Sequence, residues 1–115
     1  NIPLTKSTYY LIGEKEIKKM KNQTILINVS RGEIVDTKAL VKNLSKFKYI
    51  CLDVLEGEDK YNFKNPLIRK LASSPKVLIT PHIAFFTDYT TREIAKITYQ
   101  NINYFLNGSQ ENRVV

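Results

Sequence analysis

The chain has 115 residues, of which 43% are hydrophobic and 25% are charged, a composition typical of one folded domain and not of a disordered or collagen-like chain. No stretch approaches the roughly 18 apolar residues that a membrane span needs, and the single cysteine, Cys51, excludes an internal disulfide and a cysteine-rich metal site. The formal charge of +7 would suit a nucleic-acid partner, but the lysines are scattered over every polar stretch, so we expect a solvated surface instead.

Residues 1–12 lack a starting methionine and contain proline and several hydroxyl side chains, which is typical of a loop. We then expect a short helix over residues 14–21, with Ile17 and Met20 on one side. The run ILINV, residues 25–29, is apolar at almost every position. Such a run predicts a strand that is buried on both faces, as in a parallel sheet.

Asp36 can cap a helix that begins at Thr37, because its carboxylate accepts backbone N–H groups that have no partner in the helix. An amphipathic stripe predicts the buried side of this helix, and it consists of Leu40, Val41, Leu44 and Phe47. Residues 49–55 form a second apolar run, interrupted near its end by Asp53. A charged, glycine-containing loop follows at residues 56–65.

We expect a short helix over residues 66–71 and a third strand over residues 76–80, stopped by a proline. Thr90 with Glu93 matches a capping box, so a long helix is predicted over residues 88–107. Its expected inward side chains are Ile94, Ile97, Ile102, Phe105 and Leu106.

Buried strands that alternate with amphipathic helices predict an α/β fold of three layers, a parallel sheet flanked by helices on both faces. Three strands make a narrow sheet, with an edge that stays open unless another segment pairs with it. Together with the missing methionine, this indicates that the chain is part of a longer protein.

In open parallel sheets, ligands bind beyond the carboxyl ends of the strands. The first strand is followed by Arg31, the second contains Asp53 near its end and precedes Glu56 and Glu58, and the third precedes His82. Because parallel strands end at the same edge, we expect these side chains to converge there.

An arginine, a carboxylate and a histidine at one edge suit proton transfer to a substrate that carries a carboxylate. Histidine can donate or accept a proton near neutral pH, a neighbouring carboxylate favours its protonated form, and a guanidinium binds a carboxylate at two points. Taken singly, each of these residues is explained more simply as a surface charge or a structural contact, except Asp53, because an acid at the end of an apolar strand needs a partner. A metal site is not expected, because the sequence has one histidine and no clustered cysteines.

Three motifs in this order make the sequence recognisable: NVSRGEIVDTKAL (residues 28–40), LDVLEGE (52–58) and TPHIAFFT (80–87). They resemble the C-terminal part of the D-isomer-specific 2-hydroxyacid dehydrogenases, and the histidine and acid motifs are similar to the D-lactate dehydrogenase branch. The resemblance implies the second half of a Rossmann-type NAD-binding domain over residues 1–108, including the long helix, with residues 109–115 as a tail.

The resemblance also implies a role for each matching residue. Arg31 would hold the substrate carboxylate and carbonyl, His82 would be the general acid, and Glu58 would be its carboxylate partner. Asp53 would face the nicotinamide carboxamide. The remaining positions would line the NAD cofactor, together with Arg31: Pro3, Thr8, Val29 and Ser30.

The family's fingerprint GxGxxG does not occur in the sequence, whose four glycines are at 13, 32, 57 and 108. We therefore expect a fragment of an oxidoreductase that reduces a pyruvate-like 2-oxo acid to the D-2-hydroxy acid with NADH, and that is inactive by itself. The resemblance further implies a homodimer when complete. With no export signal evident, a cytoplasmic location is expected.

Two other functions remain open from the sequence. Dehydrogenase folds are also used as NAD-sensing interaction modules of the co-repressor type, in which the motifs persist without turnover. A nucleic-acid binder would rest on the net charge alone. We expect neither a nucleic-acid partner nor a membrane partner.

Overall fold

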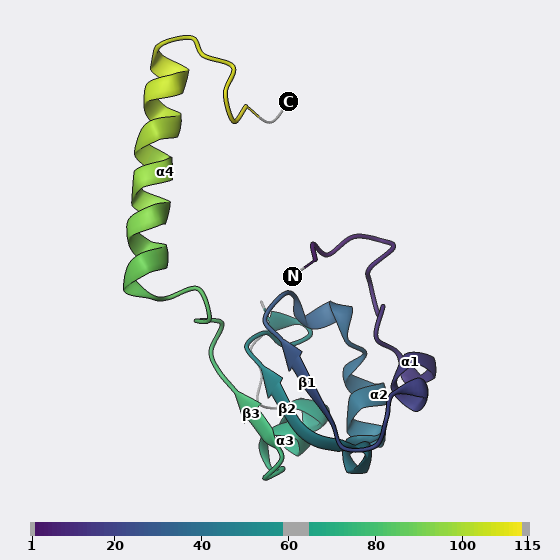
Figure 1. Ribbon diagram of the computed structural model, residues 1–115. Helices are drawn as coiled ribbons and strands as arrows, with labels where there is room; N and C mark the ends of the chain where they lie inside the picture. Colours follow the sequence, from purple (N-terminus) through teal and green to yellow (C-terminus); the bar gives the residue numbers. More distant parts are fainter. Residues whose placement is uncertain (1, 59–64, 114–115) are drawn as a thin grey trace. The chain divides into compact units, whose positions relative to one another are not determined.

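The computed structural model describes residues 2–58 and 65–113, and the chain forms two compact units, residues 1–83 and 84–115. Figure 1 shows the elements. The first unit contains α1 (Glu14–Lys19), β1 (Thr24–Asn28), η1 (Gly32–Ile34), α2 (Thr37–Lys42), η2 (Leu44–Lys46), β2 (Phe47–Leu52), α3 (Pro66–Ala72) and β3 (Val77–Ile79). The second unit contains α4 (Asp88–Leu106).

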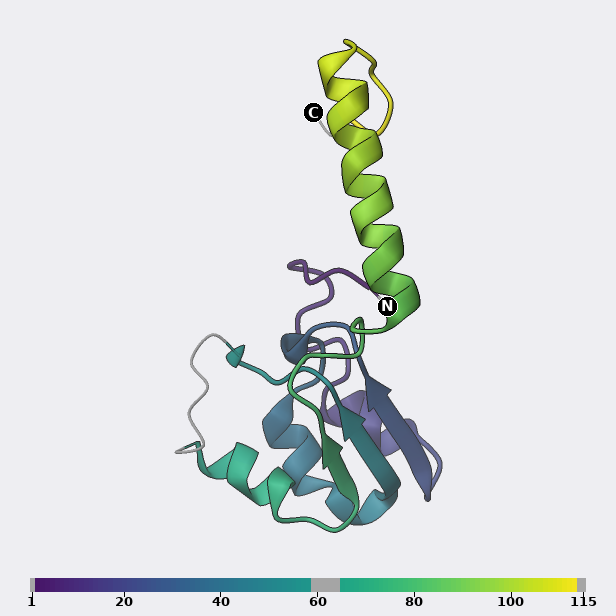
Figure 2. The same ribbon diagram turned by 90° about the vertical axis from the view of Figure 1, so that its left-hand side faces the viewer.

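The three strands form one sheet in the order β1-β2-β3, and both pairs of neighbours are parallel. The register places Ile27 beside Cys51 and Leu52 beside Ile79. All three strands therefore end at the same edge, as the arrows in Figure 2 show. The predicted α/β fold, a parallel sheet flanked by helices, is confirmed.

The hydrophobic core lies between one face of the sheet and the helices α1, α2 and α3. Its fully buried side chains come from all of these elements: Ile17, Leu40, Phe47, Ile50 and Leu71. Burial of one such side chain stabilises the fold by about 1.5–3 kcal/mol. The core therefore fixes the strands, and with them the loops that follow the strands.

The other face of the sheet is exposed in the described part of the chain. The large apolar side chains that point there are at least half exposed, namely Ile25, Ile27, Tyr49 and Leu78, and Cys51 on the same face is partly exposed. The expectation that the strands are buried on both faces thus holds for one face only, because α1, α2 and α3 all contribute to the same core.

The boundary between the second helix and the second strand differs from the sequence prediction. The stripe from Leu40 predicted Phe47 on the helix, but α2 ends at Lys42, where Asn43 donates from Nδ2 to the carbonyl of Ala39 at 2.8 Å. Phe47 instead begins β2 and is fully buried. Its ring enters the same core from the strand, so hydrophobic spacing alone could not distinguish the two elements.

The long helix α4 begins at Asp88 and is capped by Thr87, whose Oγ1 accepts from the N–H of Thr90 at 3.1 Å. Thr90 is therefore in the first turn and is not the cap that the sequence predicted. No residue of α4 is buried, and the apolar side chains expected to point inward are exposed. Most of the second unit is the helix itself, so few residues of that unit can pack against it. Within the described ranges, no helix is long and apolar enough to cross a membrane.

Glu14 links the first two helices. Its Oε1 lies 2.8 Å from the Nζ atoms of both Lys18 in α1 and Lys42 in α2. These lysines lower the pKa of Glu14 from its ordinary 4.5 to about 2. The stabilising contribution of this carboxylate is therefore complete above pH 4.5 and is lost as the pH falls toward 2.

We expect Glu14→Gln to remove that part of the acid sensitivity. Urea unfolding at a series of pH values should show that the wild-type midpoint exceeds the variant midpoint at pH 7, and that the difference closes as the pH falls below 4.5. Because these groups are exposed, high salt should shrink the difference at pH 7. A difference that grew on acidification would contradict this assignment.

Candidate active site

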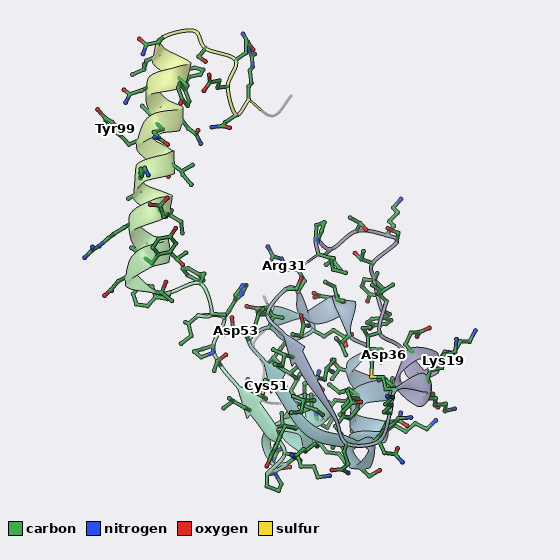
Figure 3. All side chains as sticks on the ribbon, in the orientation of Figure 1. Lys19, Arg31, Asp36, Cys51, Asp53 and Tyr99 are labelled. Atoms are coloured by element: carbon green, nitrogen blue, oxygen red, sulfur yellow. The ribbon has the colours of Figure 1, made fainter. Side chains whose placement is uncertain are left out.

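Three loops follow the carboxyl ends of the three strands and meet at one edge of the sheet. We name them the arginine turn (residues 29–32), the acid loop (residues 53–58) and the histidine loop (residues 80–83). Figure 3 shows Arg31 and Asp53 at this edge. The convergence follows from the parallel strand directions, as the sequence predicted.

The acid and histidine loops are joined by a contact between the Oε1 atom of Glu58 and the Nδ1 atom of His82. A carboxylate only accepts hydrogen bonds, so Nδ1 carries a proton and Nε2 is the nitrogen left to serve a ligand. The His82 side chain is 41% exposed and that of Glu58 is 21% exposed. The imidazole is thus oriented from one side and accessible from the other.

The backbone of His82 has a φ of +54°, a left-handed conformation that few residues other than glycine adopt. Its N–H donates to the carbonyl oxygens of Asp53 at 2.9 Å and of Thr80 at 3.0 Å. The sharp turn of the histidine loop is therefore held by the end of β2 and aims the ring back over the acid loop.

Asp53 is 4% exposed and lies at the end of β2. Its Oδ1 accepts from the hydroxyl of Thr80 and from the N–H of Ile83, the latter at 3.0 Å. Its own N–H donates to the carbonyl of Asn28 at 3.0 Å. Asp53 therefore connects the starts of all three loops. Its expected contact with the nicotinamide of the cofactor stays a prediction.

The arginine turn is shaped by Asn28, which is 6% exposed. Its Nδ2 donates to the carbonyl of Arg31 at 2.8 Å, and its Oδ1 accepts from the N–H of Ser30 at 3.0 Å. The guanidinium of Arg31 is exposed and donates to the carbonyl of Ser30 at 2.7 Å. Asn28 is not among the site residues predicted from the sequence, although it is a polar residue that ends an apolar strand, as Asp53 is.

The predicted cofactor positions near the N-terminus lie beside the arginine turn. The hydroxyl of Ser30 donates to the carbonyl of Ile2 at 2.6 Å and accepts from its N–H at 3.1 Å. Thr8 donates from its hydroxyl to the carbonyl of Pro3 at 2.7 Å, and Val29 is 43% exposed. The structure thus brings Pro3, Thr8, Val29, Ser30 and Arg31 to one rim, whereas Asp53 is buried beneath it.

Comparison with known proteins identifies the family. Residues 1–84 match the family model described as "D-isomer specific 2-hydroxyacid dehydrogenase, NAD binding domain". Among curated relatives, a D-specific alpha-keto acid dehydrogenase of Enterococcus faecium is 38% identical, and the match covers 88% of this chain and 34% of that protein. A glyoxylate reductase of Thermococcus gammatolerans is 42% identical and covers 93% of this chain and 31% of that protein.

Solved structures agree with the sequence relatives. The NAD-complexed D-isomer-specific 2-hydroxyacid dehydrogenase of Lactobacillus delbrueckii ssp. bulgaricus has a TM-score of 0.88 and 36% identity, over 100% of this chain and 38% of that one. The D-lactate dehydrogenase of Lactobacillus jensenii with NAD+ has a TM-score of 0.87 and 39% identity over the same shares. The chain therefore spans about a third of the length of the proteins it matches, 31–38%.

The parallel sheet and its loop edge define an NAD-binding domain of the Rossmann type. The chain belongs to the D-isomer-specific 2-hydroxyacid dehydrogenase family, as the three sequence motifs predicted. Because the matching model is that of the NAD-binding domain, the predicted cofactor, NAD, is confirmed for the domain.

The groups at the rim fit one end of that cofactor. The exposed Val29 offers an apolar surface to a flat ring, and the exposed Arg31 guanidinium beside it suits an anionic group. The pyrophosphate-binding sequence GxGxxG is not among the 115 residues. The contact of these residues with the nicotinamide end stays a prediction.

Proposed function

We propose that this chain supplies the nicotinamide-binding edge and the acid–base residues of an NADH-dependent D-2-hydroxyacid dehydrogenase. The observation that carries the proposal is the contact between Glu58 and Nδ1 of His82 at the edge that also bears Arg31. This combination suits the reduction of a 2-oxo acid, since the substrate has one carboxylate to anchor and one carbonyl oxygen to protonate.

When bound at the rim that carries Val29 and Arg31, NADH would supply the hydride that the carbonyl carbon of the substrate accepts. Arg31 binds the substrate carboxylate and polarises the adjacent carbonyl. His82 donates the proton on Nε2 to the carbonyl oxygen, which becomes the hydroxyl of the product. Glu58 keeps Nδ1 protonated and stabilises the imidazolium until that transfer, after which solvent restores the proton.

We favour a small 2-oxo acid such as pyruvate as the substrate. Two observations support this choice. Solved structures of D-lactate dehydrogenases are similar to this chain, and its histidine and acid motifs resemble those of the D-lactate dehydrogenase branch of the family. Relatives named as glyoxylate reductases and aromatic 2-oxoacid reductases define the other acids to compare. The complete set of Arg31, Glu58 and His82 favours an enzyme over an NAD-sensing interaction module.

The test is a chimera in which this chain replaces the matching 38% of the Lactobacillus jensenii enzyme; we refer to it below as the chimera. NADH oxidation should be measured with pyruvate, glyoxylate and phenylpyruvate, and the product resolved by chiral chromatography. We expect the D-hydroxy acid, with the highest kcat/KM for pyruvate. A folded chimera that oxidises NADH with none of these acids would contradict the proposal.

The 115-residue chain alone should bind NADH weakly and turn over nothing, because pyrophosphate contacts supply much of the binding energy for a dinucleotide. Isothermal calorimetry provides the check. Micromolar affinity would show that this half of the domain holds the cofactor by itself, contrary to the proposal.

A further inference from the structure

The acid loop is held in place by residues outside it. The phenolic hydroxyl of Tyr10 donates to Oε1 of Glu56, and Oε2 of Glu56 accepts from the N–H of Thr37 at 3.3 Å. On the next residue, the N–H of Gly57 donates to Oε1 of Glu33 at 3.0 Å. These three contacts hold the two residues that immediately precede Glu58, the partner of His82.

Tyr10 is itself rigidly placed. Its N–H donates to the carbonyl of Glu33 at 2.8 Å, and its ring packs against that of Tyr9 with 4.2 Å between the ring centres. Its backbone has a φ of +51°, which is rare for a tyrosine. The hydrogen bond to Glu56 raises the pKa of Tyr10 well above its ordinary 10, so the hydroxyl remains a donor below pH 10.

The link between Glu56 and Glu58 is a single residue, Gly57. It is exposed, has a φ of +69°, and has open space around the position of a Cβ. Glycine restricts its neighbours less than any other residue. The orientation of Glu58 therefore depends on how firmly Glu56 and the N–H of Gly57 are held.

We propose that Tyr10 is a positioning residue, which acts through Glu56 to keep the Glu58 carboxylate against Nδ1 of His82. As far as it concerns turnover, this inference rests on the function proposed above. Within the described residues, the side chain of Tyr10 contacts Glu56 and Tyr9 and neither Glu58 nor His82, so its effect on the reaction must pass through the acid loop.

The kinetic test removes the hydroxyl alone. In the chimera, Tyr10→Phe should lower kcat about 10-fold, the size expected for loss of one hydrogen bond to a charged group, with KM changed less than about twofold. Glu56→Ala should have the same effect, and the double variant should be no worse than either single one. Glu56→Gln, which keeps an acceptor for Tyr10, should retain most of the activity.

Two further variants separate positioning from general destabilisation. Tyr49→Phe removes a hydroxyl from the exposed face of β2 and serves as the matched control, with an expected change below about twofold. In a Glu58→Ala background, Tyr10→Phe should add less than about twofold to the loss, because the side chain through which it acts is gone. An undiminished 10-fold loss in that background would overturn the proposal.

A second readout needs no turnover. His82 is the only histidine in the sequence, so the ring nitrogens of the 15N-histidine-labelled chain give an unobscured NMR signature. We expect Tyr10→Phe, but not Tyr49→Phe, to weaken the Nδ1–H signal through faster exchange with water. If this change occurs in a protein without reductase activity, the positioning role stands and the proposed function fails. Unchanged spectra and kinetics in Tyr10→Phe, with activity present, would overturn the positioning role alone.

Discussion

Replacing His82 with glutamine in the chimera is expected to lower kcat by about 100- to 10,000-fold, the range that a general acid contributes. KM for pyruvate should change much less, because the Arg31 guanidinium, which we propose anchors the substrate, is on a different loop. Glutamine can donate a hydrogen bond to the carbonyl oxygen but cannot release the proton that the product keeps. Stopped-flow measurement of NADH oxidation separates this step from product release.

The backbone of His82 provides the control for folding. Its left-handed φ of +54° disfavours many side chains but is tolerated by asparagine. His82→Asn should therefore be as inactive as His82→Gln while unfolding at the same urea concentration as the parent. Retention of more than about a tenth of kcat in both folded variants would exclude His82 as the general acid.

Glu58→Gln tests the pair that these two residues form. The amide can still accept a hydrogen bond from Nδ1 of His82, but it carries no charge to stabilise the imidazolium. The kcat of Glu58→Gln should lie between the kcat of the parent and that of His82→Gln. The double variant should match His82→Gln, because a carboxylate that acts only through the imidazole has nothing left to assist.

The sequence indicated the parallel sheet because three short apolar runs alternate with helical segments, and neither property depends on exact boundaries. It missed the end of the second helix, since Phe47 fits the helical stripe and the strand equally well. The apolar pattern also could not show which face of each strand is covered. That depends on which helices pack on it, and all three helices of the first unit contribute to the same core.

Part of the site could be predicted from the sequence because it depends only on the order and direction of the strands. Arg31, Glu58 and His82 follow strand ends, so strand direction alone brings their loops together. The contact of Tyr10 with Glu56 joins residues 46 positions apart, and no local pattern relates a loop tyrosine to a distant acid. The structural roles of Asp53 and Asn28 could be suspected from their position in apolar runs, but their partners could not be.

Gly32 shows how tightly the arginine turn is pressed against the acid loop. A Cβ at this position would lie 2.0 Å from the carbonyl carbon of Leu55, 2.2 Å from its oxygen and 2.3 Å from the nitrogen of Glu56. These are backbone atoms of a buried segment, so they cannot rotate away as a side chain could. We expect Gly32→Ala to lower the free energy of unfolding of the chimera by about 3 kcal/mol or more, the upper end of the cost of overpacking.

Gly13→Ala is the matched comparison. A Cβ at Gly13 would lie 3.4 Å from the flexible carboxylate of Glu16, and its φ of −100° suits alanine. The cost should stay within about 1 kcal/mol. Urea unfolding of both variants gives the comparison, and equal costs would contradict the close approach at Gly32. Because separating the two loops also moves Arg31 away from Glu58, any Gly32→Ala protein that still folds should lose turnover, whereas Gly13→Ala should retain it.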